Sequence, residues 1–413
     1  NAVAFGSWCR WWGVVGSGLV DRVALGVLTR SVPAGLVDEV VAECGRRERR
    51  RRKLPARLVV YYVLAMCLFP RAGYEEVARL LVEGLPGWVR WRVPNKSSIS
   101  RARARLGAEV VRRLFARVAG PVAGPGTPGA LWRGLRVMAV DGTVLEVPDS
   151  PGNAEAFGGQ TGAGGVRVGY PQVRVVTLAE CGTHAIADAE VGAYTEGEPG
   201  LVRRLARATG AGMLVLADRG LLGVALWRAF TATGAHLLVR ARHQVANKII
   251  SVLPDGSYLA RLSPCHKSAH WGGSPPGPVT VRIIEYTVDG GEVIRLATSL
   301  LDPQAAPAAE LASLYHQRWE IESAYREFKT YQRGAGLVLR SRDPEGVRQE
   351  VWAHLVVYQA IRDLICHAAP GAAHGDPDRL SFTRALNIVR RSIPAQAGLS
   401  PLPPGPSGPP GLR

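Results

Sequence analysis

The sequence has few cysteines, and they do not form a recognisable metal or redox motif. The six cysteines are scattered along 413 residues without a CxxC pair, at Cys9, Cys44, Cys67, Cys181, Cys265 and Cys366. This spacing gives no support for a zinc site or a disulfide framework, and it suits a reducing cytoplasm. The sequence also lacks an HExxH motif, so a histidine metal site is not expected.

Long apolar runs and two catalytic motifs are also missing. The longest apolar run, Leu58 to Phe69, has 12 residues, whereas a spanning helix needs about 20, so this run predicts a buried helix. No secretory signal opens the sequence, and we expect a cytoplasmic, nucleoid-associated protein. Neither the phosphate-binding motif GxxxxGK[ST] nor the nucleophile motif GxSxG is present, which argues against nucleotide-dependent and acyl-transfer chemistry.

Lysine is scarce, whereas arginine is abundant and concentrated towards one end. Only five of the 51 basic residues are lysine, and the net charge is +17. Residues 1–133 carry 23 basic and 9 acidic side chains, a net +14, while residues 134–413 carry 28 and 25, a net +3. Such a concentration of positive charge is typical of proteins that bind a polyanion, usually nucleic acid.

Residues 1–125 predict an all-α, basic, DNA-binding domain. Helical patterns cover about 34–43, 55–68 and 74–82, and the stretch 94–107 begins with N-cap residues and continues as a basic helix. This order resembles a helix-turn-helix; the alternatives are a small helical bundle with an ordinary charged face and, for the run RRERRRRKLP, a solvated loop. The cations expected to contact DNA are Arg49, Arg50, Arg51, Arg52, Lys53, Arg101, Arg103 and Arg105.

A linker rich in proline and glycine, at 121–130, precedes a region with a different pattern. Strand and helix patterns alternate over residues 131–370, which predicts an α/β domain, and the interval of about 240–300 within it is mainly strand-like. Residues 371–413 are predicted to form a C-terminal segment. Its tail, from about Ser400, is rich in proline and glycine and is expected to be disordered.

The run YHQRWEIESAYREFKTYQRG predicts a helix with a narrow polar stripe. At about 100° per residue, Tyr315, Arg318, Glu322 and Lys329 fall within about 60° of arc, beside an apolar face. The stripe therefore lies between core and solvent, where a helix can present a carboxylate and two cations to a ligand. The alternative is that Arg318 and Glu322 are an ordinary pair four residues apart on an exposed helix.

Three acidic residues far apart in the sequence are expected to meet. Asp141 and Asp218 each end an apolar strand, and Glu322 belongs to the helix just described. Three carboxylates at one point repel each other unless a cation lies among them. Oxygen ligands favour Mg²⁺ or Mn²⁺, and two such ions would activate a water or a 3′-hydroxyl for phosphoryl transfer.

The order and spacing of these motifs resemble the DDE transposases of bacterial insertion sequences, specifically the insertion-sequence-four family. The first acidic motif is AVDGT, the second is ADRG, and the third is Tyr, two residues, Arg, three residues, Glu, six residues, Lys. The resemblance covers most of residues 30–370, including the helical region before the linker. One departure is Leu221, at a position where the family often has an aromatic residue.

The resemblance implies a ribonuclease-H-like catalytic core with a mainly β insertion between the second aspartate and the glutamate. It implies a catalytic and metal-binding triad of Asp141, Asp218 and Glu322. It also implies contacts to the DNA of the transposon end by Tyr315, Arg318, Lys329 and Arg219. The implied activity is cut-and-paste transposition, with end cleavage through a hairpin and strand transfer, and with a flipped base stacked on an aromatic residue such as Trp271.

The implied partners are the terminal inverted repeats and target DNA, bound by a homodimer. Two other functions compete: a metal-dependent nuclease of the same fold, and an inactive DNA-binding protein derived from a transposase. The presence of all three acids argues against the second. Five other acidic residues are predicted to have structural roles only. Asp149 is expected in a turn, Asp188 and Glu190 on the exposed side of a strand, and Glu196 and Glu198 at the start of a helix.

Overall fold

The computed structural model forms two compact units, one of residues 1–106 with 389–413 and one of residues 107–388. The residues that it describes are 23–50, 52–83, 85, 90–162, 164–242, 248–264, 277–287, 291–371 and 375–395. Several positions discussed above lie outside the described residues, namely Cys9, Arg51, Cys265, Trp271 and the tail from Ser400.

The first unit is helical, as its sequence pattern predicted. Its α-helices are α1 (Ala34–Glu43), α2 (Ala56–Leu68), α3 (Tyr74–Leu80) and α4 (Lys96–Leu106). Helix α2 is the apolar run noted above, and it is buried along nearly its whole length. The Tyr61 hydroxyl donates to the Val32 carbonyl, and Arg390, from the C-terminal part of the unit, donates to the Leu68 carbonyl at 2.7 Å. These bonds fix both ends of the unit to its central helix.

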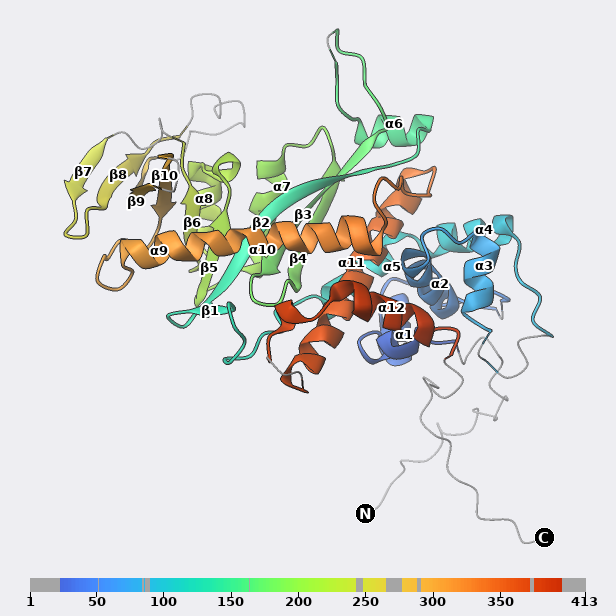
Figure 1. Cartoon of the computed structure of the whole chain (residues 1–413). Coiled ribbons are helices and arrows are strands. Elements are labelled where there is room, and N and C mark those ends of the chain that lie inside the picture. The colour runs from blue at the N-terminus through green and yellow to red at the C-terminus, as the bar shows by residue number, and fades with distance from the viewer. Residues whose placement is uncertain are drawn as a thin grey trace, which may run out of the picture. The chain divides into compact units, whose positions relative to one another are not determined.

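The second unit is built on one large mixed sheet (Figure 1). The strand order is β4-β3-β2-β5-β6-β10-β9-β8-β7, with β1 paired to β2 alone. The strands are β1 (Leu131–Trp132), β2 (Leu135–Glu146), β3 (Gln172–Glu180), β4 (Ile186–Ala193), β5 (Met213–Ala217), β6 (His236–Arg240), β7 (Ile249–Val252), β8 (Tyr258–Leu262), β9 (Val279–Thr287) and β10 (Val293–Thr298). The mixed α/β class predicted from the sequence is therefore confirmed.

Strand direction divides the sheet into two parts. Strands β2, β5 and β6 are parallel to one another, whereas β3 and β4 continue from β2 as antiparallel neighbours. Strands β10, β9, β8 and β7 extend the other side in antiparallel order. Val140 of β2 pairs with Ala217 of β5. Because the two strands are parallel, the residues that follow this pair, Asp141 and Asp218, lie at neighbouring positions.

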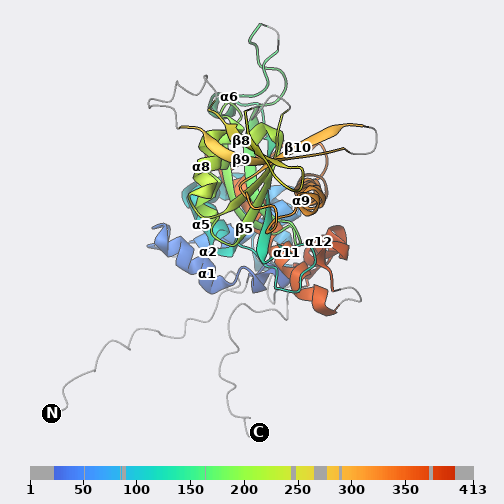
Figure 2. The ribbon, with the colours of Figure 1, turned by 90° about the vertical axis from the view of Figure 1, so that its left-hand side faces the viewer.

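Helices cover both faces of the sheet, and Figure 2 shows α8 and α9 on opposite sides of it. Helices α7 (Glu198–Arg204) and α8 (Val224–Thr231) pack on one face, and α9 (Ala308–Tyr315) and α10 (Trp319–Arg326) pack on the other. Side chains alternate along β2, so that Val140 joins the core beneath α7 and α8 while Ala139 joins the core beneath α9 and α10. Asp141 consequently points towards α10, and Gly142 faces α7.

The other α-helices are α5 (Ala108–Val118), α6 (Pro151–Phe157), α11 (Pro344–Ala368) and α12 (Phe382–Ser392). Helix α5 packs along α11, where the rings of Phe115 and Trp352 lie 5.4 Å apart and Gln349 donates to the Gly107 carbonyl at 2.9 Å. The compact units thus differ from the predicted limits, because α5 falls within 1–125 but packs in the second unit. No described helix is both long and apolar enough to cross a membrane.

Candidate active site

Asp141 is a partly buried carboxylate with other charges close to it. Its Oδ1 accepts the Gly142 N–H at 2.8 Å. Burial raises the pKa of Asp141 to about 6; the Gly142 N–H and Arg318 oppose this rise, while the carboxylates of Glu198 and Asp218 add to it. Asp218 is therefore near enough to raise the pKa of Asp141, as expected from the pairing of Val140 with Ala217.

Arg318 connects the carboxylates of the sheet with that of the helix. Its Nη2 lies 3.1 Å from Glu322 Oε1, and its Nη1 lies 4.0 Å from Asp141 Oδ2. Burial alone would lower the pKa of Arg318, but Tyr315, Asp218, Asp141 and Glu322 outweigh burial, so the pKa is raised. The arginine and Glu322 are indeed four residues apart, yet the exposed-pair alternative does not describe a guanidinium that also faces Asp141. The structure brings all three predicted acids around this one side chain.

Two tyrosines hold the helix to the strands that carry the aspartates. The Tyr315 hydroxyl donates to the carbonyl of Ala217, the residue before Asp218, at 3.0 Å, and burial raises the pKa of Tyr315. The Tyr325 hydroxyl donates to the Asp141 carbonyl and lies 2.9 Å from Thr177 Oγ1. The buried Tyr315 does not fit the expectation of a direct DNA contact, because its hydroxyl is already used inside the core. Sequence reasoning missed Tyr325, whose periodicity indicated only an apolar face.

The signature segment, residues 315–334, was predicted to be one helix. It is not a uniform α-helix, so this prediction was wrong. A 3₁₀ turn at His316–Arg318 precedes α10, and a π-helical segment, Glu327–Gln332, follows it. A π-helix closes its hydrogen bonds over five residues, so the regular wheel of 100° per residue does not apply at Lys329, which lies in this segment. Its Nζ donates to Thr143 Oγ1 of β2 at 3.1 Å, and burial and Arg333 lower the pKa of Lys329. Lys329 therefore contacts β2, the strand that contains Asp141.

Two exposed side chains flank the acids. Arg219 follows Asp218 directly and is exposed. Trp319 is 59 % exposed, one turn before Glu322, and its ring lies 5.5 Å from the Arg318 guanidinium. Sequence reasoning gave Trp319 no role; its signal was an aromatic residue directly after the stripe arginine. Leu221 is buried, so the departure from the family pattern at that position affects packing rather than the site.

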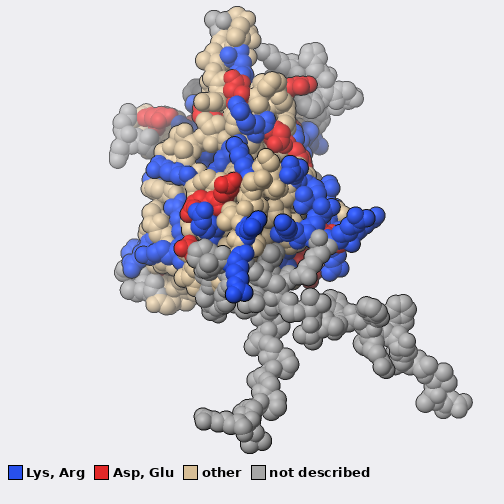
Figure 3. Space-filling view, turned by 90° about the vertical axis from the view of Figure 1, so that its right-hand side faces the viewer, with Lys and Arg blue, Asp and Glu red and all other residues tan. Residues whose placement is uncertain are grey.

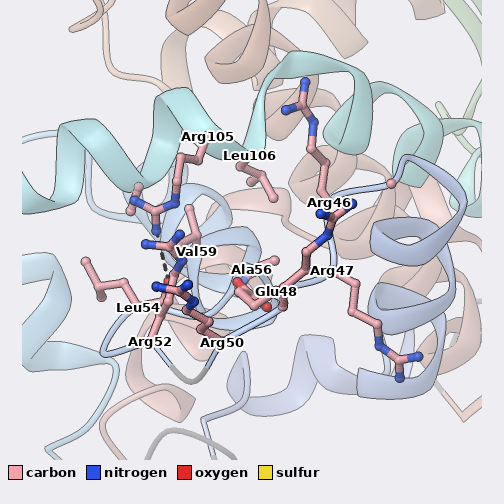
Figure 4. A pocket seen from close by; sticks show the side chains of 13 residues that line it. Arg46, Arg47, Glu48, Arg50, Arg52, Leu54, Ala56, Val59, Arg105 and Leu106 are labelled. Carbon is pink, nitrogen blue, oxygen red and sulfur yellow. Dashed lines mark hydrogen bonds between the residues drawn. The ribbon is translucent and has the colours of Figure 1, made fainter.

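In the first unit, arginines surround a cavity of about 440 Å³ (Figure 4). Its charged lining consists of Glu48, Arg46, Arg47, Arg49, Arg50, Arg52 and Arg105. The Glu48 carboxylate accepts the Ala56 N–H at the start of α2, and Arg105 donates to the Leu54 carbonyl at 3.3 Å. The long basic side chains around one acidic group therefore form a positively charged hollow rather than a chain of ion pairs.

The predicted cations of the first unit differ in exposure. Arg101 and Lys53 are exposed, and Figure 3 shows a face of the molecule on which Lys and Arg side chains clearly outnumber Asp and Glu. Arg103 is different, because it lies on the buried side of α4, donates to the Tyr74 hydroxyl at 3.1 Å and stacks on that ring. This packing does not fit the predicted DNA contact of Arg103.

A second cluster of ionisable groups surrounds His184, away from the triad. His184 Nε2 lies 2.7 Å from Glu320 and 3.6 Å from Asp378, a grouping whose ligand atoms are close enough to hold a metal ion. The guanidinium of Arg362, however, contacts Nδ1. Arginine only donates, so Nδ1 accepts and Nε2 carries the proton that it donates to Glu320. These contacts give both ring nitrogens of His184 a protein partner.

The remaining acids mostly have structural partners. Asp149 pairs with Arg167 after β2. Asp188 and Glu190, predicted on the exposed side of a strand, are partly buried and both pair with Arg207. Glu198 begins α7 as expected. Its carboxylate also helps to raise the pKa of Asp141, an effect that no sequence pattern indicated.

Comparisons with known proteins agree with the geometry. The family model described as insertion element 4 transposase N-terminal matches residues 22–116, and the model described as transposase DDE domain matches residues 132–359. The transposase InsG for insertion sequence element IS4 of Escherichia coli (strain K12) is 33% identical over 368 residues, which are 89% of this chain and 82% of that protein. The putative transposase InsZ of the same strain is 25% identical over 49% of this chain and 67% of that protein.

Among solved structures, the piggyBac transposase synaptic complex with hairpin DNA aligns over 94% of this chain and 82% of that chain. The TM-score is 0.47 and the sequence identity is 8%. A likeness at this level does not establish a common fold.

Proposed function

The chain is a DDE transposase that belongs to the insertion element 4 family, and from this premise we propose that Asp141, Asp218 and Glu322 carry its DNA cleavage and strand transfer. The observation that supports this assignment is the convergence of the three acids around Arg318, although they come from two strands and a helix on one face of the sheet. The outcome is cut-and-paste transposition, with end cleavage through a hairpin.

We propose that the core is ribonuclease-H-like. Three antiparallel strands, β4-β3-β2, continue into the parallel strands β5 and β6, with helices on both faces. Strands β7 to β10 extend the sheet between Asp218 and Glu322, which supports the expected β insertion. In this arrangement Asp141 lies within β2, Asp218 directly follows the adjacent strand β5, and Glu322 is carried by α10 on one face of the sheet.

The donor atoms fit divalent metal ions, on which DDE transposases depend. All three side chains offer carboxylate oxygens, which are hard ligands suited to Mg²⁺ or Mn²⁺. Burial, and to a smaller extent the neighbouring carboxylates, raises the pKa of Asp141 to about 6, so compensating positive charge would stabilise its charged form. Two bound ions would supply that compensation and activate the attacking water or 3′-hydroxyl. We propose that these three residues hold them.

The side chains around the acids are suited to position DNA. Arg318 offers a guanidinium for bidentate phosphate contact, and Lys329 offers a point charge beside β2. Arg219 is exposed next to Asp218. Trp319, exposed one turn before Glu322, is placed to stack on a flipped base. The sequence left the choice of aromatic open, with Trp271 as one candidate.

We infer that the first unit binds the terminal inverted repeats. The arginine-lined cavity and the exposed cations Arg101 and Lys53 match a phosphate backbone in charge. Two copies acting on paired ends would form the homodimer expected of the DNA complex. Crosslinking with and without DNA ends tests this point, since a complex with one copy per end pair contradicts it.

The decisive experiment measures cleavage and strand transfer on DNA that carries the element's inverted repeats, in Mg²⁺ or Mn²⁺. We expect Asp141→Asn, Asp218→Asn and Glu322→Gln each to lose at least about a hundredfold in cleavage while still binding DNA ends. Retained cleavage in all three variants would refute the assignment. Cleavage without strand transfer by the unmodified protein would favour a nuclease instead.

A further inference from the structure

Glu198 reaches the strand of Asp141 from the opposite face of the sheet. It is the first residue of α7, and its carboxylate lies against the backbone of Gly142. A Cβ added at Gly142 would be 2.6 Å from Glu198 Oε1 and 2.8 Å from its Cδ. Gly142 does not have a positive φ, and the two nearest atoms belong to the end of the flexible Glu198 side chain, so a side chain at this position would displace the carboxylate rather than strain the backbone. The absence of a side chain lets a carboxylate approach the residue after Asp141.

The charge of Glu198 affects the pKa of two groups at the proposed site. It contributes to the raised pKa of Asp141, after burial, which is the largest cause, and the opposing Gly142 N–H. It also contributes, after burial and Asp141, to the raised pKa of Tyr325, whose hydroxyl donates to the Asp141 carbonyl. Glu198 thus belongs electrostatically to the site, although α7 packs on the face away from α10.

An ordinary ion pair accounts for only part of this placement. Arg174 Nη1 lies 3.5 Å from Glu198 Oε2, and within the described residues this is the only ion pair that Glu198 makes. The same guanidinium donates to the Tyr194 carbonyl at 3.3 Å and stacks on the Tyr194 ring. The other oxygen, Oε1, is the one directed at Gly142. Arg174 therefore holds one side of the carboxylate and leaves the other towards the strand of Asp141.

Charge balance gives this carboxylate a role. Two divalent ions carry four positive charges, whereas the triad supplies three negative charges and Arg318 adds a positive one. We propose that Glu198 is a fourth carboxylate of the divalent-metal site, supplying negative charge from the far side of the sheet beside Asp141. This inference rests on the proposed function of Asp141, Asp218 and Glu322 as metal ligands.

The test measures Mn²⁺ binding to the full-length protein without DNA, by electron paramagnetic resonance of free Mn²⁺ at neutral pH. Glu198→Gln keeps the size of the side chain and removes its charge, and we expect it to weaken Mn²⁺ binding by about tenfold. Glu198→Ala, which opens space at Gly142, should give a similar loss and serves if the glutamine variant does not fold. Near-ultraviolet circular dichroism checks the fold of each variant.

Glu196→Gln is the matched control. Glu196 also lies against a glycine, Gly192, and pairs with an arginine, Arg204, at 2.7 Å, but it is not among the charges that act on Asp141. Its removal should leave Mn²⁺ affinity within about twofold of the unmodified protein. Arg174→Gln breaks the ion pair while retaining the Glu198 charge, and we expect it to bind Mn²⁺ at least as tightly as the unmodified protein.

Three results would overturn the inference. If Glu198→Gln binds Mn²⁺ normally while Asp141→Asn binds it weakly, Glu198 is not part of a metal site that otherwise stands. If Asp141→Asn also binds normally, the proposed triad itself fails. If Arg174→Gln and Glu198→Gln lose affinity and thermal stability equally, Glu198 acts only as a structural partner of Arg174.

Discussion

At the scale of single residues, Asp141 is a partly buried carboxyl group whose charged form is disfavoured first by burial and then by neighbouring carboxylates. Its pKa is raised from 3.8 to about 6 in the folded state, first by burial. The folded chain therefore holds this proton more tightly than the unfolded chain. The resulting stability is fully present below about pH 4 and is lost as the pH rises through about 6, a loss of roughly 3 kcal/mol.

A pH series measures this effect. We expect the free energy of unfolding of the unmodified protein, in chelator, to fall by about 3 kcal/mol more between pH 4 and pH 7 than that of Asp141→Asn. Denaturant unfolding at each pH gives the difference, and Asp149→Asn, an exposed acid, is the control that should follow the unmodified protein. Parallel curves for Asp141→Asn and the unmodified protein would show that Asp141 is not buried as described.

Lys329 allows a second prediction at this scale. If its ammonium contacts a phosphate, Lys329→Ala should weaken end binding and reduce the slope of log K against log salt by about one. Lys248→Ala, an exposed lysine beside β7, removes the same charge away from the acids and should leave the slope unchanged. Filter binding over a salt series decides; an unaltered slope for Lys329→Ala would exclude the phosphate contact.

At the scale of elements, a buried ion pair anchors the signature segment to α11. Arg362 contacts Glu327, and the Tyr358 hydroxyl donates to the same carboxylate at 3.0 Å. The side chain of Arg362 is only 1% exposed. Because Glu327 begins the π-helical segment that follows α10, this pair holds the helix of Glu322 from its far end.

Removal of one partner should be costly, because a buried charge is left uncompensated. We expect Glu327→Gln to lower the free energy of unfolding by about 3 kcal/mol. The control is Glu109→Gln, which breaks exposed pairs with Arg112 and Arg113 on α5 and should cost less than about 1 kcal/mol. Urea unfolding measures both variants, and equal small losses would mean that the pair does not anchor the segment.

At the scale of the whole molecule, positive charge and catalytic groups lie in different parts of the chain. Residues 1–133 carry a net +14, while the acids belong to the second compact unit. We therefore expect removal of residues 1–106 together with 389–413 to abolish preference for the inverted repeats. The cut keeps α5, because α5 packs on α11.

Competition between end DNA and unrelated DNA measures this preference, with circular dichroism as the check that the remaining unit folds. Loss of preference with retained weak binding supports recognition by the first unit. Persistent preference for the ends would assign sequence recognition to the second unit instead.

The sequence by itself predicted much of the local structure of this protein. Apolar periodicity and capping residues act over a few neighbours, so the helices of the first unit and the strand that precedes Asp218 were readable. The prediction that Asp141 ends a strand was wrong, because β2 continues through Asp141 to Glu146 by pairing with β3. The spacing of the motifs identified the family because it is a property of the sequence and does not depend on the folded structure. The net charge of the N-terminal third needed no structure either.

Tertiary structure decided where the functional side chains meet and which of them are occupied by contacts inside the fold. The hydroxyl of Tyr315 and the guanidinium of Arg103 are buried by partners distant in sequence, and local patterns carry no information about such contacts. The π-helical segment Glu327–Gln332, which contains Lys329, departs from the regular α-helix that the sequence predicted. The approach of Glu198 to Gly142 joins α7 to β2, although the two residues are separated by 55 intervening positions. Only chain folding creates that proximity, because electrostatic and packing forces depend on distance in space and not on distance along the sequence.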